Sequence, residues 1–115
     1  MKYITIPDFY FDSLIDWSDV GDIQNLYPEI DSYHASLAKE FRNCRIPGRK
    51  LSLMYNLIDS IWLSSDKDLS TEQTLFLTEL IHSEVDSKFL LIDAINEIAE
   101  AETRDWRILY EGDRR

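Results

Sequence analysis

Cysteine, glycine and proline are scarce in this sequence of 115 residues. A single cysteine, Cys44, excludes a disulfide within the chain and agrees with a reducing compartment. Three glycines leave no phosphate-binding loop, dinucleotide fingerprint or nucleophile elbow, since each of these motifs depends on glycine. The 44% of hydrophobic residues exclude a low-complexity or disordered chain and predict one soluble globular domain.

Long apolar runs and basic residues are also lacking. No stretch approaches the roughly 18 to 20 apolar residues of a membrane span, and MKYITIPDF has no secretory-signal pattern, so we expect a cytoplasmic protein without a membrane partner. Lysine and arginine number 12 against 22 acidic residues, which gives a net charge of -10. That charge repels nucleic acid and attracts basic proteins, although it also serves solubility.

The charge is divided unevenly along the chain. Residues 1–33 hold seven acids and one base, whereas residues 34–58 hold one acid and five bases. Residues 59–102 hold eleven acids and two bases, and residues 103–115 hold three acids and four bases. Half of the aromatic residues fall in the first segment. Acidic and aromatic side chains are therefore concentrated together at the start of the chain.

Hydrophobic spacing predicts helices through most of the sequence. In PEIDSYHASLAKEFRNC, apolar residues recur three and four positions apart, with Pro28 suited to the first helical turn. A second helix is expected over about 49–64, and its wide apolar arc indicates a central, largely buried position. The spacing of Ser70 and Gln73 is that of a capping box, which predicts another helix through Ile81.

The last third of the chain is expected to hold one more helix, over about 87–103, with Asp86 as its cap. Beyond it, RILY is either a helical continuation or an extended segment, and residues 110–115 read as a frayed tail. KYITI, residues 2–6, has strand composition and can pair with the C-terminal segment. The predicted fold is a single all-α domain over 1–115, a compact bundle of about five helices with a minor N-terminal strand.

The opening segment PDFYFDSLIDWSDVGDI, residues 7–23, is predicted to form the first of these helices. At 3.6 residues per turn, Asp8, Asp12, Asp16 and Asp19 fall on one stripe. The opposite arc holds apolar and aromatic residues, namely Tyr10, Phe11, Leu14, Ile15 and Trp17. Like charges four apart are mildly destabilising, and aspartate is a poor residue inside a helix. Helix stability therefore does not account for the row of aspartates.

Enzymatic chemistry has little support in the residues. Cys44 follows a helix whose C-terminal end disfavours a thiolate, so we expect a small buried side chain rather than a nucleophile. The pairs Asp31 with His34 and Glu79 with His82 have the carboxylate-x-x-His spacing of di-metal helical bundles. In the predicted helices, these carboxylate and histidine side chains do not all point toward one common site. No metal or cofactor is therefore expected, and a di-metal enzyme is the remotest alternative.

The two histidines and the basic stretch have simpler interpretations than a catalytic or metal-binding role. We predict that His34 is a core or interface histidine, and that His82 is a surface residue paired locally with Glu79 or Asp86. KEFRNCRIPGRK, residues 39–50, carries bases that suit a phosphate contact or a counter-patch to the acidic helices. The four bases from Arg42 to Lys50 have no aromatic residue among them, and in a chain of this charge direct nucleic-acid binding is not expected.

The acidic and aromatic stretch is typical of a protein interface, in which aromatic anchors supply buried area and charges select the partner. In size, acidity, helical pattern and the stretch DFYFDSLIDW, the sequence resembles the small immunity proteins that bacteria carry against their own nuclease toxins, including colicin-type and contact-dependent growth-inhibition systems. The resemblance is one of class, without an aligned motif. It implies a non-enzymatic cytoplasmic inhibitor that binds a basic nuclease toxin tightly.

A basic protein partner is accordingly the leading hypothesis. The alternatives are a structural or adaptor subunit and a phage-type inhibitor that mimics nucleic acid. A second possible binding face is the later acidic block of Asp66, Asp68, Glu72, Glu79, Glu84 and Asp86. The residues predicted to contact the partner are Asp8, Tyr10, Asp12, Asp16, Trp17, Asp19, Asp22 and Tyr27.

Overall fold

The computed structural model describes residues 1–8, 16–84 and 86–111. These residues form a mostly helical domain with a small sheet, which confirms the predicted fold class. In chain order the elements are β1 (Lys2–Ile6), α1 (Val20–Leu26), α2 (Ser32–Asn43), α3 (Pro47–Ser64), α4 (Thr71–His82), α5 (Lys88–Ala101) and β2 (Trp106–Tyr110).

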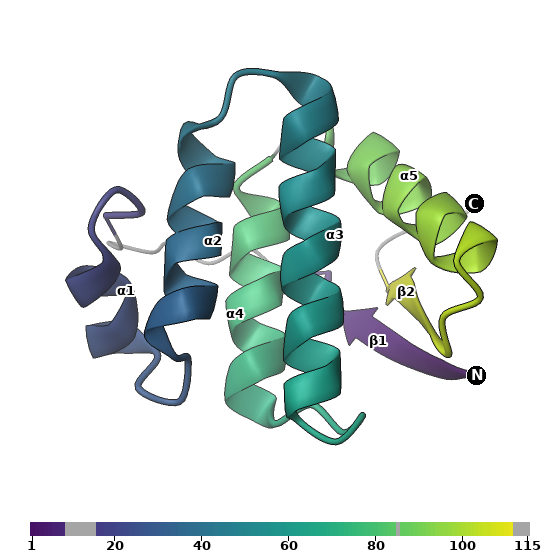
Figure 1. Cartoon of the computed structure of the whole chain (residues 1–115), viewed down its shortest axis with the longest axis horizontal. Coiled ribbons are helices and arrows are strands. Elements are labelled where there is room, and N and C mark those ends of the chain that lie inside the picture. Colours follow the sequence, from purple (N-terminus) through teal and green to yellow (C-terminus); the bar gives the residue numbers. More distant parts are fainter. Residues whose placement is uncertain (9–15, 85, 112–115) are drawn as a thin grey trace.

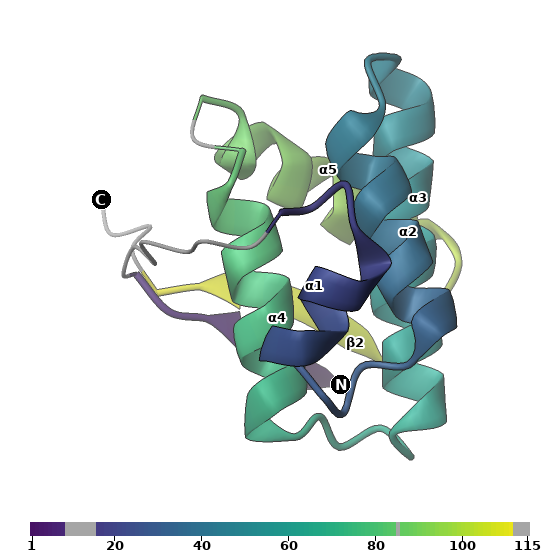
Figure 2. The ribbon, with the colours of Figure 1, turned by 90° about the vertical axis from the view of Figure 1, so that its left-hand side faces the viewer.

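The helices are arranged around the long helix α3. Figure 1 shows α2 and α3 side by side with α4 behind them, α1 beyond α2, and α5 beyond α3 near the strands. Figure 2 shows α1 lying across the side of the bundle formed by α2 and α4. None of the helices in the described parts of the chain has the length and apolar content needed to cross a bilayer.

The prediction of a central, largely buried helix over about 49–64 is confirmed by α3. Seven of its side chains belong to the hydrophobic core, and they occupy the wide arc that the apolar spacing indicated: Leu53, Met54, Tyr55, Leu57, Ile58, Ile61 and Trp62. Helix α3 starts at Pro47, which suits the first turn because proline has no amide hydrogen to leave unpaired there.

The strand predicted at the N-terminus is confirmed, and it pairs with the C-terminal segment. β1 and β2 lie parallel, with Ile4 opposite Ile108. In β2 the side chains of Trp106, Ile108 and Tyr110 are buried, and the two residues between them are exposed. Parallel strands need a long crossover connection, and here the crossover includes all five helices. RILY is therefore extended, not helical.

Several predicted helix ends are confirmed and others are corrected. Ser70 and Gln73 form the expected capping box at the start of α4. Helix α2 begins at Ser32 rather than near Pro28, because the Asp31 carboxylate caps it by accepting a hydrogen bond from the His34 amide. Asp86 does not cap α5; the capping position is Ser87, which makes no side-chain cap bond.

Among the described residues, the predicted opening helix over 7–23 is helical only from Val20 onward. Asp16 to Asp19 form a turn, and α1 begins only at Val20. The physical reason is that the Asp16 and Asp19 carboxylates bind nearby backbone amides, which offers the chain an alternative to a continuous helix. Tyr10 and Asp12, with the rest of residues 9–15, lie outside the described residues. Asp8 is described, is exposed, and follows β1.

Candidate protein-binding surface

The segment from Asp16 to Tyr33 carries five acidic side chains and neither lysine nor arginine. All five are exposed, and they lie on α1 and on the turns at either end of it. We term them the acidic edge: Asp16, Asp19, Asp22, Glu29 and Asp31. A basic partner would be attracted to this part of the surface because no basic residue of the segment offsets the negative charge.

Three members of the acidic edge also have local structural roles. Asp16 Oδ1 accepts hydrogen bonds from the Ser18 amide (3.0 Å) and hydroxyl (2.6 Å), which lower the pKa of Asp16. Asp19 accepts from the Gly21 amide (2.8 Å) as the cap of α1, and Asp31 caps α2. Serine, threonine or asparagine would serve as caps as well. Capping thus explains polar side chains at these positions but not a set of charges of one sign.

The acidic edge meets the second acidic block of the sequence at the start of α4. The Glu29 amide donates a hydrogen bond to Glu72 Oε2, and the Ser70 hydroxyl donates to Glu29 Oε1 (2.9 Å). Two acidic residues 43 positions apart in the chain are therefore in direct contact, the backbone of Glu29 with the carboxylate of Glu72. The sequence gives no sign of this proximity, which extends the negative surface from α1 to α4.

The second acidic block as a whole does not form one exposed face, which corrects that alternative. Glu79 is buried. Glu84 has a side chain only 13% exposed and pairs with Lys50 (2.9 Å) and Arg42 (3.4 Å). Asp66, Asp68 and Asp86 are exposed, and Glu72 is half-buried beside Glu29.

The aromatic residues predicted as anchors are largely part of the core. Tyr27 is buried, donates to Glu79 Oε2 (2.6 Å), and packs edge-to-face on Phe76. Burial and the adjacent Glu79 carboxylate raise the pKa of Tyr27 above its ordinary range. Trp17 is half-buried, with its ring centroid 5.9 Å from that of Phe76. Tyr27 is accordingly a core residue, and Trp17 offers a partner only part of its ring.

Asp8 also has an internal contact. Its carboxylate accepts a hydrogen bond from the Tyr110 hydroxyl (3.0 Å), which ties the residues after β1 to the end of β2. Asp22, in contrast, lies in the first turn of α1 with an exposed side chain. Of the described residues predicted to contact a partner, Asp16, Asp19 and Asp22 lie in the acidic edge, whereas Asp8, Trp17 and Tyr27 contact the body of the domain.

Two exposed apolar side chains flank the acidic edge and were not among the predicted contacts. Leu26 is 52% exposed at the end of α1, and Tyr33 is 60% exposed in the first turn of α2. Tyr33 follows the cap Asp31 by two positions, whereas His34 is the residue that turns into the core. The one-residue difference decides which side chain is available to a partner, and helical spacing alone did not separate them.

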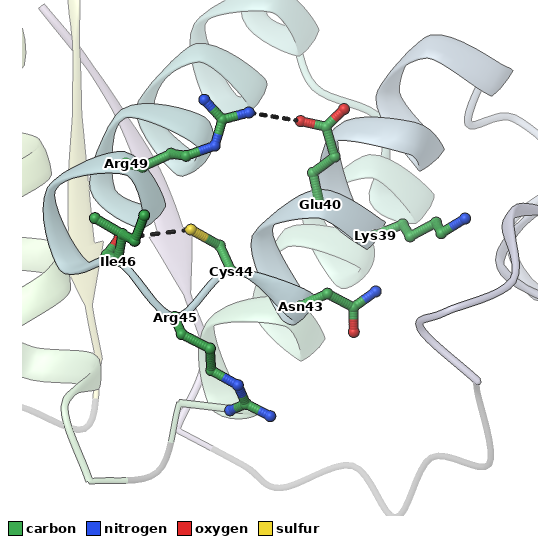
Figure 3. Close-up of a pocket in the computed structure, with 7 residues that line it drawn as sticks. All are labelled: Lys39, Glu40, Asn43, Cys44, Arg45, Ile46 and Arg49. Atoms are coloured by element: carbon green, nitrogen blue, oxygen red, sulfur yellow. Dashed lines mark hydrogen bonds and ion pairs between the residues drawn. The ribbon is translucent and has the colours of Figure 1, made fainter.

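A basic corner surrounds the turn between α2 and α3. Figure 3 shows its cavity, of about 450 Å³, with Cys44 at the centre and with Lys39 and Arg45 directed away from it. The Cys44 thiol is half-buried and donates to the Ile46 carbonyl (3.5 Å), and Arg49 pairs with Glu40 (3.6 Å). The cavity is lined by Lys39, Glu40, Asn43, Cys44, Arg45, Ile46 and Arg49.

The charges of this corner are partly used inside the domain. Arg42 and Lys50 both pair with Glu84, which follows α4 by two residues, so this part of the basic stretch is a counter-patch to the acidic segment there, as predicted. Within the described parts of the chain, no aromatic side chain lines the cavity. The stacking platforms that single-stranded nucleic-acid binders use are therefore lacking at this cavity.

The histidines have internal partners. His34 is buried as predicted, with Nε2 2.8 Å from Ser60 Oγ and Nδ1 3.2 Å from Asp31 Oδ1. The predicted surface position of His82 is wrong, because its ring is buried against Tyr110 and its Nε2 lies 3.0 Å from the Pro7 carbonyl. Among the described residues, no group of three or more potential ligand side chains is placed to hold a metal ion.

The order Ser60, His34, Asp31 resembles a nucleophile, base and acid, but its setting favours a structural role. Ser60 lies inside α3, where backbone amides are occupied by helical hydrogen bonds and are not free to bind an oxyanion. Asp31 Oδ1 is already the cap of α2. Because His34 and Ser60 come from neighbouring helices, their contact links α2 to α3.

Comparison with known proteins yields no relatives: no family model, curated protein or solved structure matches the chain significantly.

Proposed function

We propose that this protein is a non-enzymatic inhibitor that binds a basic protein partner, in the manner of the bacterial immunity proteins that neutralise nuclease toxins. The observation that carries the proposal is the acidic edge, in which five exposed carboxylates lie in a segment without lysine or arginine. Three have capping or turn roles that uncharged residues would fulfil, so the shared charge suggests selection by a partner.

A nuclease is the class of partner that this surface fits best. An enzyme that binds nucleic acid presents a positively charged cleft to phosphates, and carboxylates on a rigid protein can occupy the same positions. The net charge of -10 steers such a partner toward the inhibitor from a distance. Leu26 and Tyr33, exposed beside the carboxylates, supply apolar contact area. Such an inhibitor would act in the cytoplasm, where the nucleic acid needs protection.

The test is native affinity purification of the tagged chain from cells that encode it, followed by native mass spectrometry. We expect a complex of one chain with one basic protein. The activity of that protein should fall to zero as the chain is added up to an equimolar amount. An adaptor subunit would form the complex without abolishing activity, and a nucleic-acid mimic would be displaced by DNA or RNA at low salt. Recovery of the chain only as a homo-oligomer would contradict the proposal.

A further inference from the structure

A second cavity, of about 550 Å³, opens between α2 and α3, away from the basic corner. We term it the α2/α3 groove, and it is continuous with the acidic edge because Tyr33 and Asp31 are only two residues apart. Seven of the described residues line the groove, and none of these is a lysine or an arginine: Tyr33, Leu37, Asn56, Asp59, Ser60, Leu63 and Ser64.

Two large side chains on opposite walls of the groove, one aromatic and one aliphatic, are exposed. Tyr33 is 60% and Leu63 is 56% exposed, from α2 and α3 respectively, and Leu37 is half-buried between the helices. Exposed large apolar side chains gathered around a cavity are typical of interaction sites. The remaining lining residues are polar. An aliphatic side chain inserted here would cover them without providing hydrogen-bond donors, which is unfavourable.

Asp59 contributes a carboxylate to the groove; its side chain is 13% exposed, and Arg104 partly offsets its charge. Its Oδ1 accepts a hydrogen bond from the Trp106 indole (2.9 Å), and its Oδ2 lies 3.5 Å from an Arg104 nitrogen. These contacts hold the carboxylate in place but do not use all of its acceptor positions, since two oxygens offer about four. Asp31, with a side chain 61% exposed, adds a second carboxylate near Tyr33.

We infer that the α2/α3 groove receives an arginine side chain of the basic partner. The aliphatic stem would lie between Leu37 and Leu63, and the planar guanidinium would stack on the Tyr33 ring. Its donors would reach oxygens of Asp59, Asn56 or Ser64. Lysine fits less well because its ammonium is compact, strongly hydrated and unable to stack as a plane. The inference rests on the proposed function and adds the anchor of the complex.

The test uses nuclear magnetic resonance with a small probe, acetyl-Gly-Arg-Gly-amide, so that no partner needs to be known. The full chain is titrated with this peptide and with its citrulline and lysine counterparts; citrulline keeps the shape of arginine without the charge. We expect shifts at Tyr33, Asn56, Ser60 and Leu63 with arginine, weaker shifts with lysine and none with citrulline. Equal shifts with citrulline, or shifts confined to other residues, overturn the inference.

Variants of the wall provide the matched control. Tyr33→Ala should weaken arginine binding about two- to fivefold, the range expected for an exposed cation–π contact, whereas Tyr33→Phe should retain it. Tyr3→Ala removes a ring of similar exposure (57%) on β1 and should leave binding unchanged. Equal weakening by Tyr3→Ala would refute the assignment. So would shifts of the groove resonances with protein concentration alone, because a second copy would then be the occupant.

A negative titration overturns only the groove assignment. The inhibitor proposal is tested separately, by complex formation and loss of the partner's activity, and it does not require the groove assignment. Conversely, failure to recover a basic partner would contradict the inhibitor proposal whatever the peptide does. The two results are therefore distinguishable.

Discussion

The hydroxyl of Tyr27 donates a 2.6 Å hydrogen bond to Oε2 of Glu79, and both side chains are buried. The bond joins the residue that ends α1 to the middle of α4, which lie 52 positions apart in the sequence. A buried carboxylate without a donor is strongly unfavourable. This contact therefore secures the helix that carries much of the acidic edge against the rest of the domain.

Removing that donor should destabilise the fold. Tyr27→Phe leaves Glu79 without its hydroxyl partner, and we expect the free energy of unfolding in urea to fall by about 1–3 kcal/mol. Tyr33→Phe is the matched control, because it removes an exposed hydroxyl and should change stability by less than about 0.5 kcal/mol. Similar losses of unfolding free energy in the two variants would show that the hydrogen bond from Tyr27 to Glu79 does not stabilise the fold.

The buried His34 predicts that stability depends on pH below neutrality. Burial lowers the pKa of His34 from its usual value of 6.5, against an opposing effect of the Asp31 carboxylate. The unfolded chain then binds the proton more readily than the folded chain does. Stability is therefore full above about pH 6.5 and is lost as the pH falls toward the folded-state pKa, with a slope of at most about 1.4 kcal/mol per pH unit.

The variant His34→Gln should separate this effect from other titrations. Glutamine can still hydrogen-bond Ser60 but does not titrate, so urea unfolding between pH 7.5 and about 5 should show a flatter dependence than in the unchanged chain. Lys39→Gln, at an exposed position on the same helix, is the control and should leave the slope unaltered. An identical slope in all three proteins would exclude His34 as its source.

Asn96 completes the small parallel sheet. Its amide donates to the Ile108 carbonyl (3.0 Å), and its carbonyl oxygen accepts from the Ile108 amide (2.8 Å), so a side chain of α5 takes the place of a third strand. Asn96→Leu would leave both backbone groups of Ile108 buried and unpaired, and we expect a loss of about 2–4 kcal/mol. Thermal unfolding would measure this loss, and in the same assay Asn25→Leu, which changes an exposed asparagine, should be nearly neutral. Loss of helix content without loss of β2 pairing would contradict this role.

The elements predicted well from the sequence are those that local spacing controls. The apolar arc of α3, the capping box at Ser70 and the strand at residues 2–6 each depend on residues close together in the chain. The acidic composition of the candidate surface was evident in the same way. Each of these features can be recognised from the spacing of a few neighbouring residues, and each is present in the structure.

The elements predicted poorly depend on contacts between distant residues or on competition with the backbone. The pairs Tyr27 with Glu79 and His82 with Pro7 join segments that the sequence keeps far apart. Tyr27, Glu79 and His82 were therefore predicted to lie at the surface. Asn96 falls on the inward stripe of α5. The spacing of apolar residues does not reveal that its side-chain amide hydrogen-bonds the backbone of β2. At Asp16, the side chain binds a nearby amide and a turn replaces the predicted helix.

The acidic edge should control how fast the partner binds. Asp22 is exposed in the first turn of α1 and has no capping role, so Asp22→Lys reverses a charge with only a small loss of stability, about 1 kcal/mol at most, from the helix dipole. We expect the association rate with the co-purified basic partner to fall several-fold, up to about tenfold, and its salt dependence to weaken. Stopped-flow kinetics at two ionic strengths would measure both.

Glu97→Lys is the control that distinguishes a local surface from total charge. Glu97 is exposed on α5, at the opposite end of the domain from α1, and its reversal changes the net charge by the same amount. If the acidic edge faces the partner, Asp22→Lys slows association more than Glu97→Lys, because screening limits the influence of a charge more than about 10 Å from the interface. Equal slowing by both variants would mean that net charge alone steers the partner, and the binding face would then have to be sought elsewhere.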